Sequence, residues 1–256
     1  MVSRVHRDPD DFDQSARPVE STSGAVSVSD SIDKRHQAKS TRMRAALGTL
    51  FAKGVSLFAS EIRCRMPAGT DRRIYLTFDD GPTPDGTPEI LDILAQYGIP
   101  ATFFLVGRNA VRYPALVRSL PTAGHAIGNH SFSHLDAWKA SGRLLEHDLS
   151  RATKTLANLL GEPPRWMRPP FGRVTPAMMR WCRRNEQRVL LWDMMPPDFE
   201  PGVTYRQIVQ KLTRGIRRGS VICLHDNALS RRVTPAALRV ALPRLLDAGW
   251  QFATVD

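Results

Sequence analysis

Cysteine is scarce in this sequence and follows no metal-binding or disulfide pattern. The three cysteines, Cys64, Cys182 and Cys223, are an odd number, and no two have C-x-x-C spacing. Such usage indicates neither a disulfide framework nor a thiolate zinc site. It favours a reducing, cytoplasmic compartment, although an exported or membrane-associated protein stays open. Cys182 has no obvious base partner, so we expect it to be buried.

Long apolar runs are also missing. No stretch of about 20 apolar residues occurs, which excludes an ordinary membrane-spanning helix. Residues 1–41 carry Ser, Asp, Pro and Arg without periodicity, and they lack the apolar core of a secretory signal. We expect this N-terminal extension to be disordered.

Residues 42–71 are predicted to be an amphipathic helical segment and a linker. Arg42 and Arg44 precede an apolar face formed by Leu47, Leu50, Phe51, Phe58 and Ile62. Three interpretations stay open: a helix that packs on the domain, a membrane-surface anchor, or a signal whose initiator is Met43. The segment is therefore a candidate for peripheral contact with a membrane or a cell wall.

The chain carries a formal net charge of +11, much of it from arginine. A basic balance favours contact with nucleic acid, an anionic membrane surface or an acidic polymer. No basic cluster is interleaved with aromatic residues, as nucleic-acid binding would suggest, so we expect no nucleic-acid partner. For the same reason the charge is interpreted as a solvated basic surface. We expect a monomer.

Short apolar runs alternate with longer amphipathic segments from residue 72 to residue 256. Seven runs are predicted to be strands: 74–78, 101–107, 126–130, 165–170, 189–194, 221–226 and 252–255. Helices are predicted to begin with Thr87 as a cap, near Leu144, at Thr175-Pro176 and near Thr234. Regular alternation implies an α/β fold with a parallel sheet. The sheet is either an incomplete barrel or open and doubly wound, and no G-x-G-x-x-G follows the first strand to support a nucleotide site.

Polar residues follow the predicted strands at their carboxyl ends. Both architectures collect ligands at this rim. The sequence therefore predicts that one rim holds Asp79, Asp80, His130, His134, Arg168, Asp193, Asp198 and His225.

The stretch HSFSH suggests a metal site. His130 and His134 are four residues apart, which places two imidazoles on one face of a helical turn, within reach of one cation. Two histidines with one carboxylate leave open coordination positions, as in a catalytic zinc site, and iron, cobalt or nickel would also fit. The alternative for His134 is a surface residue.

Two adjacent carboxylates, Asp79 and Asp80, end the first strand just before a Gly-Pro pair. Near a metal, the carboxylate that binds it stays ionised while its neighbour can serve as a base. The alternative is that one of them starts a turn. Arg168 beside an acid would lower the pKa of that acid and fix its orientation. His225 is suited to proton donation near neutral pH.

Five stretches carry a family resemblance. In this order, TFDDGP, HSFSH, RPPFG, WDMMPPDF and CLHD resemble the five motifs of the polysaccharide deacetylase family, carbohydrate esterase family 4. The family includes chitin, chitooligosaccharide and peptidoglycan deacetylases, and the resemblance covers residues 72–256. It implies an incomplete, distorted (β/α) barrel of about seven parallel strands. It also implies a metal-dependent hydrolase that removes N-acetyl groups from N-acetylglucosamine residues of a glycan and releases acetate.

The resemblance implies roles for individual residues. Asp79 would be the general base and Arg168 would orient it. His225 would be the general acid, paired with Asp198. The ligands of a divalent metal, zinc or else cobalt or nickel, would be Asp80, His130 and His134. The residues that bind substrate would be Pro170, Phe171, Trp192 and Leu224, and the backbone N–H of Phe171 would stabilise the oxyanion.

Two departures from the family pattern affect the acetyl pocket rather than the metal. The family often has Asp-Trp where this chain has Asp198-Phe199, and commonly a leucine where this chain has Cys223. The substrate is therefore left open among chitooligosaccharide, peptidoglycan and exopolysaccharide. Two alternative functions are hydrolysis of a small amide or cyclic imide, and glycan binding without catalysis.

Overall fold

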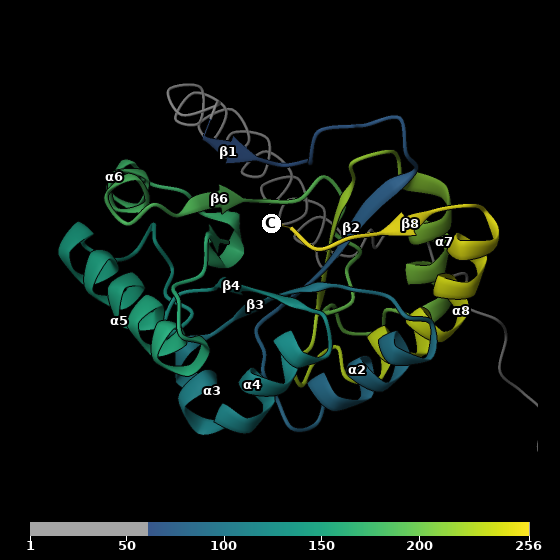
Figure 1. Ribbon diagram of the computed structural model, residues 1–256, viewed down its shortest axis with the longest axis horizontal. Helices are drawn as coiled ribbons and strands as arrows, with labels where there is room; N and C mark the ends of the chain where they lie inside the picture. Colours follow the sequence, from purple (N-terminus) through teal and green to yellow (C-terminus); the bar gives the residue numbers. More distant parts are fainter. Residues whose placement is uncertain (1–60, 256) are drawn as a thin grey trace, which may run out of the picture. The chain divides into compact units, whose positions relative to one another are not determined.

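The strands form one parallel sheet that curls on itself. The computed structural model describes residues 61–255, and Figure 1 shows the strands with helices arranged around their outside. The strand order is β1-β6-β5-β4-β3-β2-β7, and β8 also pairs with β2. The strands are β1 Ile62–Arg63, β2 Arg73–Asp79, β3 Thr102–Leu105, β4 Ala126–Asn129, β5 Trp166–Met167, β6 Arg188–Leu190, β7 Val221–His225 and β8 Gln251–Phe252.

The predicted parallel α/β sheet is confirmed, because all seven predicted strands are present as β2 to β8. An eighth strand, β1, pairs with β6 and lies ahead of residue 72. In the described part of the chain, the segments after β1 and β6 contact the β7 region through isolated bridges, Arg65 with Ser220 and Met194 with Ile222. The barrel is therefore curled but incomplete, which decides against an open doubly wound sheet.

Helices connect the strands and cover the outer face of the sheet (Figure 1). They are α2 Thr87–Gln96, α3 Gly107–Arg112, α4 Pro114–Thr122, α5 Gly142–Leu160, η2 Pro170–Gly172, α6 Pro176–Arg184, α7 Tyr205–Gly215 and α8 Val233–Asp247. Thr175 caps α6 as predicted, since its side chain accepts a hydrogen bond from the backbone N–H of Met178. No helix among residues 61–255 is long and apolar enough to cross a bilayer.

The predicted cap of α2 is wrong. Gly86 occupies the cap position and Thr87 is the first residue of the helix. The hydroxyl of Thr87 instead accepts a hydrogen bond from the backbone N–H of Thr83 and donates one to the carboxylate of Asp226. The side chain therefore ties α2 to the segment that follows β7.

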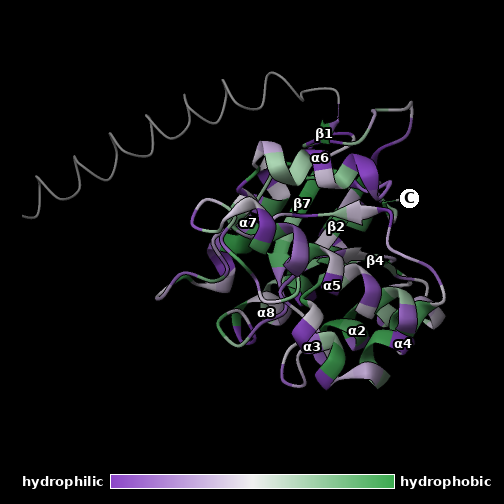
Figure 2. Ribbon diagram, turned by 90° about the vertical axis from the view of Figure 1, so that its left-hand side faces the viewer, coloured by the Kyte–Doolittle hydropathy of each residue, from purple (hydrophilic) through white to green (hydrophobic). Residues whose placement is uncertain are grey.

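Alternation along the strands divides the core into two layers. On β2, Ile74, Leu76 and Phe78 face the outer core against the helices, and Tyr75 faces the barrel interior. Both faces are covered, so the strand is buried on both sides, with Thr77 and Asp79 as its inward-facing polar residues. Figure 2 shows hydrophobic residues on β7 and on α2. The same alternation makes Asp79 the last inward-facing residue of β2.

The predictions for residues 1–60, namely the disordered extension and most of the amphipathic segment, lie outside the described residues. They stay predictions.

Candidate active site

The predicted polar residues gather at the carboxyl ends of the strands, with one exception. Asp79 ends β2, His225 ends β7 and Arg168 directly follows β5. The exception is Asp193, whose carboxylate accepts a hydrogen bond from the backbone N–H of Val221 at 2.8 Å, at the amino end of β7. The prediction that Asp193 lies on this rim is therefore wrong, because the chain turns back toward the start of β7 after β6.

Arg168 holds the carboxylate of Asp79 in a fixed orientation. Its guanidinium is fully buried, and Nη1 donates to Oδ1 of Asp79 at 2.7 Å and to Oγ1 of Thr77 at 2.7 Å. Nε donates to the carbonyl of Leu190 at 3.1 Å, and Nη2 donates to that of Leu191 at 3.0 Å. These bonds use four of the five N–H donors of the guanidinium and fix its position, so a charged group that is costly to bury is paired with a carboxylate.

Asp80, His130 and His134 converge on one point. Oδ1 of Asp80 lies 3.0 Å from Nε2 of His134 and 3.5 Å from Nε2 of His130, and one ligand atom from each residue lies within 4.8 Å of the others. This oxygen is buried yet has no hydrogen-bond partner, because the two ring nitrogens are not aligned to donate to it. Two nitrogens and one orphaned carboxylate oxygen fit a divalent cation such as zinc with open positions left for ligands.

Neighbouring groups orient these atoms toward the cation site. Nδ1 of His130 lies 2.7 Å from the carbonyl oxygen of Arg168, which can only accept, so Nδ1 carries the hydrogen and Nε2 presents its lone pair. Oδ2 of Asp80 accepts from Nδ2 of Asn227 at 2.6 Å, and its backbone carbonyl accepts from Nδ2 of Asn109 at 2.8 Å. Neither asparagine is identified by the sequence; the one signal for Asn227 is its position two residues past the predicted acid histidine.

The charges of this cluster also favour a cation. Burial raises the pKa of Asp80, but the imidazoles of His130 and His134 lower it by more, so its pKa lies well below the ordinary value. Burial lowers the pKa of His130, but the carboxylates of Asp79 and Asp80 raise it by more, so its pKa lies above the ordinary value. The carboxylate of Asp80 therefore stays ionised, and the two carboxylates favour positive charge at Nε2 of His130, which a proton or a bound cation would supply.

The HSFSH segment is a braced loop and not a helical turn. Its two imidazole centroids are 5.1 Å apart because Ser131 and His134 adopt positive φ angles of 62° and 58°. The loop is fixed by Oδ1 of Asn129, which accepts from the N–H of Ser131 at 2.8 Å, and by Asp148 of α5, whose Oδ2 accepts from Oγ of Ser133 at 2.7 Å. These buried acceptors offset the strain of the left-handed residues.

His225 faces Asp79 across the site. Its Nδ1 donates to Oδ1 of Asp198 at 2.8 Å, and Oδ2 of Asp198 accepts from the backbone N–H of His225 at 2.8 Å and from Oγ1 of Thr234 at 2.6 Å. Burial lowers the pKa of His225, but the hydrogen bond and charge of Asp198 raise it by more, to about 9. The imidazole is therefore protonated at neutral pH. The other ring nitrogen, Nε2, is not bonded to Asp198 and can donate a proton.

A second group of possible ligands is less suited to a cation. Ligand atoms of Asp79, Cys223 and His225 lie within 4.8 Å of one another. However, burial and the charge of Asp79 raise the pKa of the Cys223 thiol well above its ordinary value, so the sulfur stays protonated and donates to Oδ2 of Asp79 at 3.3 Å. Arg168 already neutralises Asp79. No sequence pattern indicates that Cys223 contacts this carboxylate.

The predicted substrate-binding residues differ in accessibility. Phe171 is 60% exposed, with a positive φ of 59° and its ring centroid 4.7 Å from that of His134. Pro170 is buried and Trp192 is half-buried, with its ring close to the backbone that follows Phe171. Leu224 is fully buried in the outer core, on the opposite face of β7 from His225, so its side chain does not reach the rim. The structure therefore does not support the prediction that the side chain of Leu224 binds substrate.

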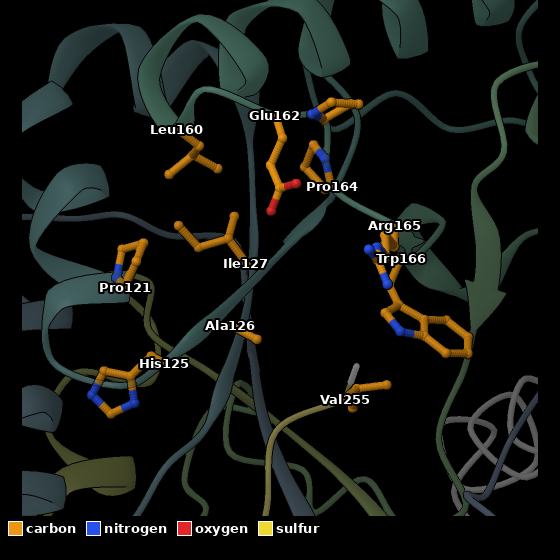
Figure 3. A pocket seen from close by; sticks show the side chains of 11 residues that line it. Pro121, His125, Ala126, Ile127, Leu160, Glu162, Pro164, Arg165, Trp166 and Val255 are labelled. Carbon is orange, nitrogen blue, oxygen red and sulfur yellow. The ribbon is translucent and has the colours of Figure 1, made fainter.

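A separate pocket of about 380 Å³ lies at the amino ends of β4 and β5 (Figure 3). Figure 3 shows Ile127, Leu160 and Pro164 around it, with Trp166 and Val255 on one side. None of the residues that line it is one of the predicted site residues. The pocket is thus at the end of the barrel opposite to the histidines and carboxylates described above.

Comparison with known proteins gives consistent findings. A family model described as polysaccharide deacetylase matches residues 67–189. A peptidoglycan-N-acetylglucosamine deacetylase of Bacillus cereus is 37% identical over 189 residues, which cover 73% of this chain and 87% of that protein. A chitooligosaccharide deacetylase of a Bradyrhizobium species is 32% identical over 77% of this chain and 94% of that protein. The solved structure of the Bc1960 peptidoglycan N-acetylglucosamine deacetylase matches with a TM-score of 0.73 and 30% identity, covering 76% of this chain and 91% of that one.

Proposed function

The chain belongs to the polysaccharide deacetylase family, and we propose how its own residues carry out the reaction of a metal-dependent N-deacetylase. The enzyme hydrolyses the N-acetyl groups of N-acetylglucosamine residues in a glycan and releases acetate. The observation that supports the assignment of residues is the facing arrangement of a fixed carboxylate and a protonated imidazole, Asp79 and His225, beside the cluster of Asp80, His130 and His134. Residues 72–256 would form the catalytic domain.

Asp80, His130 and His134 would hold the metal, with zinc as the first choice and cobalt or nickel as alternatives. When bound there, a divalent cation would polarise the acetamide carbonyl and lower the pKa of a water molecule. Asn227 and the carbonyl of Arg168 orient the ligand atoms of Asp80 and His130 through hydrogen bonds.

Asp79 would act as the general base. Its Oδ1 is occupied by Arg168, and its Oδ2 lies 4.0 Å from Nε2 of His130, on the side of the cation site. Oδ2 is therefore the oxygen placed to take a proton from the attacking water. Arg168 binds Oδ1 of Asp79 and prevents its carboxylate from rotating toward the cation site.

His225 would act as the general acid. A ring nitrogen of His225 and a carboxylate oxygen of Asp79 lie within 4.8 Å of each other, so one acetamide can contact both. Asp198 holds Nδ1, which leaves Nε2 to protonate the departing amine. The backbone N–H of Phe171 would donate to the tetrahedral oxyanion, and Pro170 and Trp192 would line the groove beside it.

The basic segment of residues 42–71 would bring the catalytic domain to a membrane surface or an anionic cell wall. A wall-located enzyme would favour peptidoglycan, and one in the cytoplasm would favour short oligosaccharides. The enzyme would act as a monomer.

The experiment is acetate release from N-acetylglucosamine oligomers and from peptidoglycan, with enzyme as purified, after chelation, and after addition of zinc, cobalt or nickel. We expect release that chelation abolishes and one of the metals restores. Asp79→Asn is the matched variant: it should keep the bound metal and lose the activity. Full activity of Asp79→Asn would contradict the role given to Asp79, and release from small amides alone would favour the small-amide alternative.

A further inference from the structure

A strip of aromatic and cationic side chains extends outward from the metal-ligand candidate His134. The ring of Phe171 packs edge-on against His134, with 4.7 Å between centroids. The guanidinium carbon of Arg173 lies 5.3 Å from the centroid of Phe171 and 4.9 Å from that of Trp138. The strip therefore runs from His134 through Phe171 and Arg173 to Trp138, and its outer end lies beyond the residues assigned to the reaction.

Trp138 is exposed yet held in place. Its side chain is 41% exposed, although large aromatic side chains gain free energy when buried. Its Nε1 donates to the carbonyl of Val174 at 3.2 Å, and its backbone N–H donates to Oδ1 of Asp136 at 3.1 Å. Asp136 also pairs with Arg173. An exposed ring fixed at both its indole nitrogen and its backbone is preorganised to bind a ligand without losing side-chain freedom.

The charge of the strip indicates the kind of ligand. Arg173 keeps part of its side chain accessible, 29%, and Asp136 pairs both with it and, at 3.9 Å, with the exposed Lys139. Phe171 and Trp138 offer flat apolar faces, and the remaining N–H groups of Arg173 can donate to hydroxyl groups. This combination suits a neutral sugar ring, which has an apolar face and a rim of hydroxyls.

We propose that Trp138, backed by Arg173, forms a binding subsite for a neutral sugar unit of the glycan next to the unit that is deacetylated. This rests on the proposed function, because the strip begins at the reacting centre. The subsite gives the enzyme a preference for oligomers over a single sugar. Trp138 contributes to substrate binding and has no part in the bond-breaking step.

The experiment compares wild type, Trp138→Ala, Trp138→Phe and Leu246→Ala on N-acetylglucosamine and its dimer, trimer and tetramer. Leu246 is the matched control: it is an exposed apolar side chain in the last turn of α8, at the other end of the barrel. We expect Trp138→Ala to lower kcat/KM for the tetramer about tenfold, and by more than for the single sugar. Trp138→Phe keeps an aromatic face and should recover part of the loss, while Leu246→Ala should match wild type. The melting temperature of each variant checks that it is folded.

The same proteins are titrated with the tetramer to measure Kd, which separates this inference from the proposed reaction. If wild type releases acetate and Trp138→Ala shows the same dependence of activity on chain length, the subsite is overturned while the proposed reaction stands. If wild type releases no acetate, a tetramer Kd that rises about tenfold in Trp138→Ala would still support the subsite. Absence of tetramer binding by both proteins would overturn it.

Discussion

Replacing Asp198 by asparagine should move the basic limb of the pH–rate profile. His225 must be protonated to act as the acid, so the rate falls as the pH rises through its pKa. In the wild-type site that pKa is about 9 because burial is outweighed by the hydrogen bond and charge of Asp198. The asparagine side chain would lack the charge, and its amide could satisfy only part of the three donors that now meet the Asp198 carboxylate.

The size of the effect follows from the shift. Raising the pKa from 6.5 to about 9 corresponds to about 3 kcal/mol in favour of imidazolium. Without the Asp198 carboxylate the pKa of His225 should fall, while the charges of Asp79 and Asp80, which also raise it, remain and oppose part of that fall. A return to the ordinary value of about 6.5 would lower the protonated fraction at pH 8 about thirtyfold. A cation at Asp80 opposes protonation of His225, so the metal-loaded wild type should show its limb at or below about pH 9.

The assay is kcat against pH from 5 to 10 for wild type and Asp198→Asn, with the His225 ring resonances followed by NMR over the same range. Thr234→Val is the control: it removes one donor to Asp198 but keeps the charge, so its limb should stay close to that of wild type. The same linkage acts on stability. The His225–Asp198 pair stabilises the fold fully below about pH 6.5, and this contribution is lost as the pH rises through about 9. If Asp198→Asn lowers kcat by the same factor at every pH and the basic limb stays at its wild-type position, the reasoning is refuted.

Three further predictions concern the supports of the site. Asn227→Ala removes the donor to Oδ2 of Asp80 and should weaken zinc binding about 10- to 100-fold in competition with a chromophoric chelator; an unchanged affinity would show that the carboxylate is held without it. Arg168→Gln leaves a buried carboxylate without its partner and should lower the free energy of unfolding by about 3–5 kcal/mol in urea titrations, with activity lost. Gly81→Ala would place a Cβ 2.1 Å from Oδ2 of the buried Asp226, so we expect a lower melting temperature and weaker metal binding, and wild-type values for both would contradict this packing.

Alternation and spacing were enough to predict the barrel but not its closure. The seven runs became β2 to β8 because an apolar run that is covered on both faces has one stable place, inside a parallel sheet with helices outside. β1 is two residues long and carries no periodic signal. It belongs to the sheet because Ile62 pairs with Val189 of β6, and these two residues are far apart in the chain.

The residues of the candidate site could also be predicted only in part. Adjacent carboxylates at a strand end, paired histidines and a histidine after the sixth predicted strand are local patterns, so the sequence could indicate a metal, a base and an acid. Asp193 and Leu224 were misplaced because a residue near a strand end reaches the rim only if the chain continues outward and the side chain faces inward. Local sequence encodes neither condition.

The sequence by itself determined the parallel α/β class and the family, and it predicted a donor set for a cation. Only the tertiary structure decided the contacts around the site: Asn227 with Asp80, Cys223 with Asp79, and Trp138 with the carbonyl of Val174. The reason is physical. Residue type sets the chemistry that a side chain can perform, whereas hydrogen bonds of this kind act over about 3 Å and join segments that only the folded chain brings together.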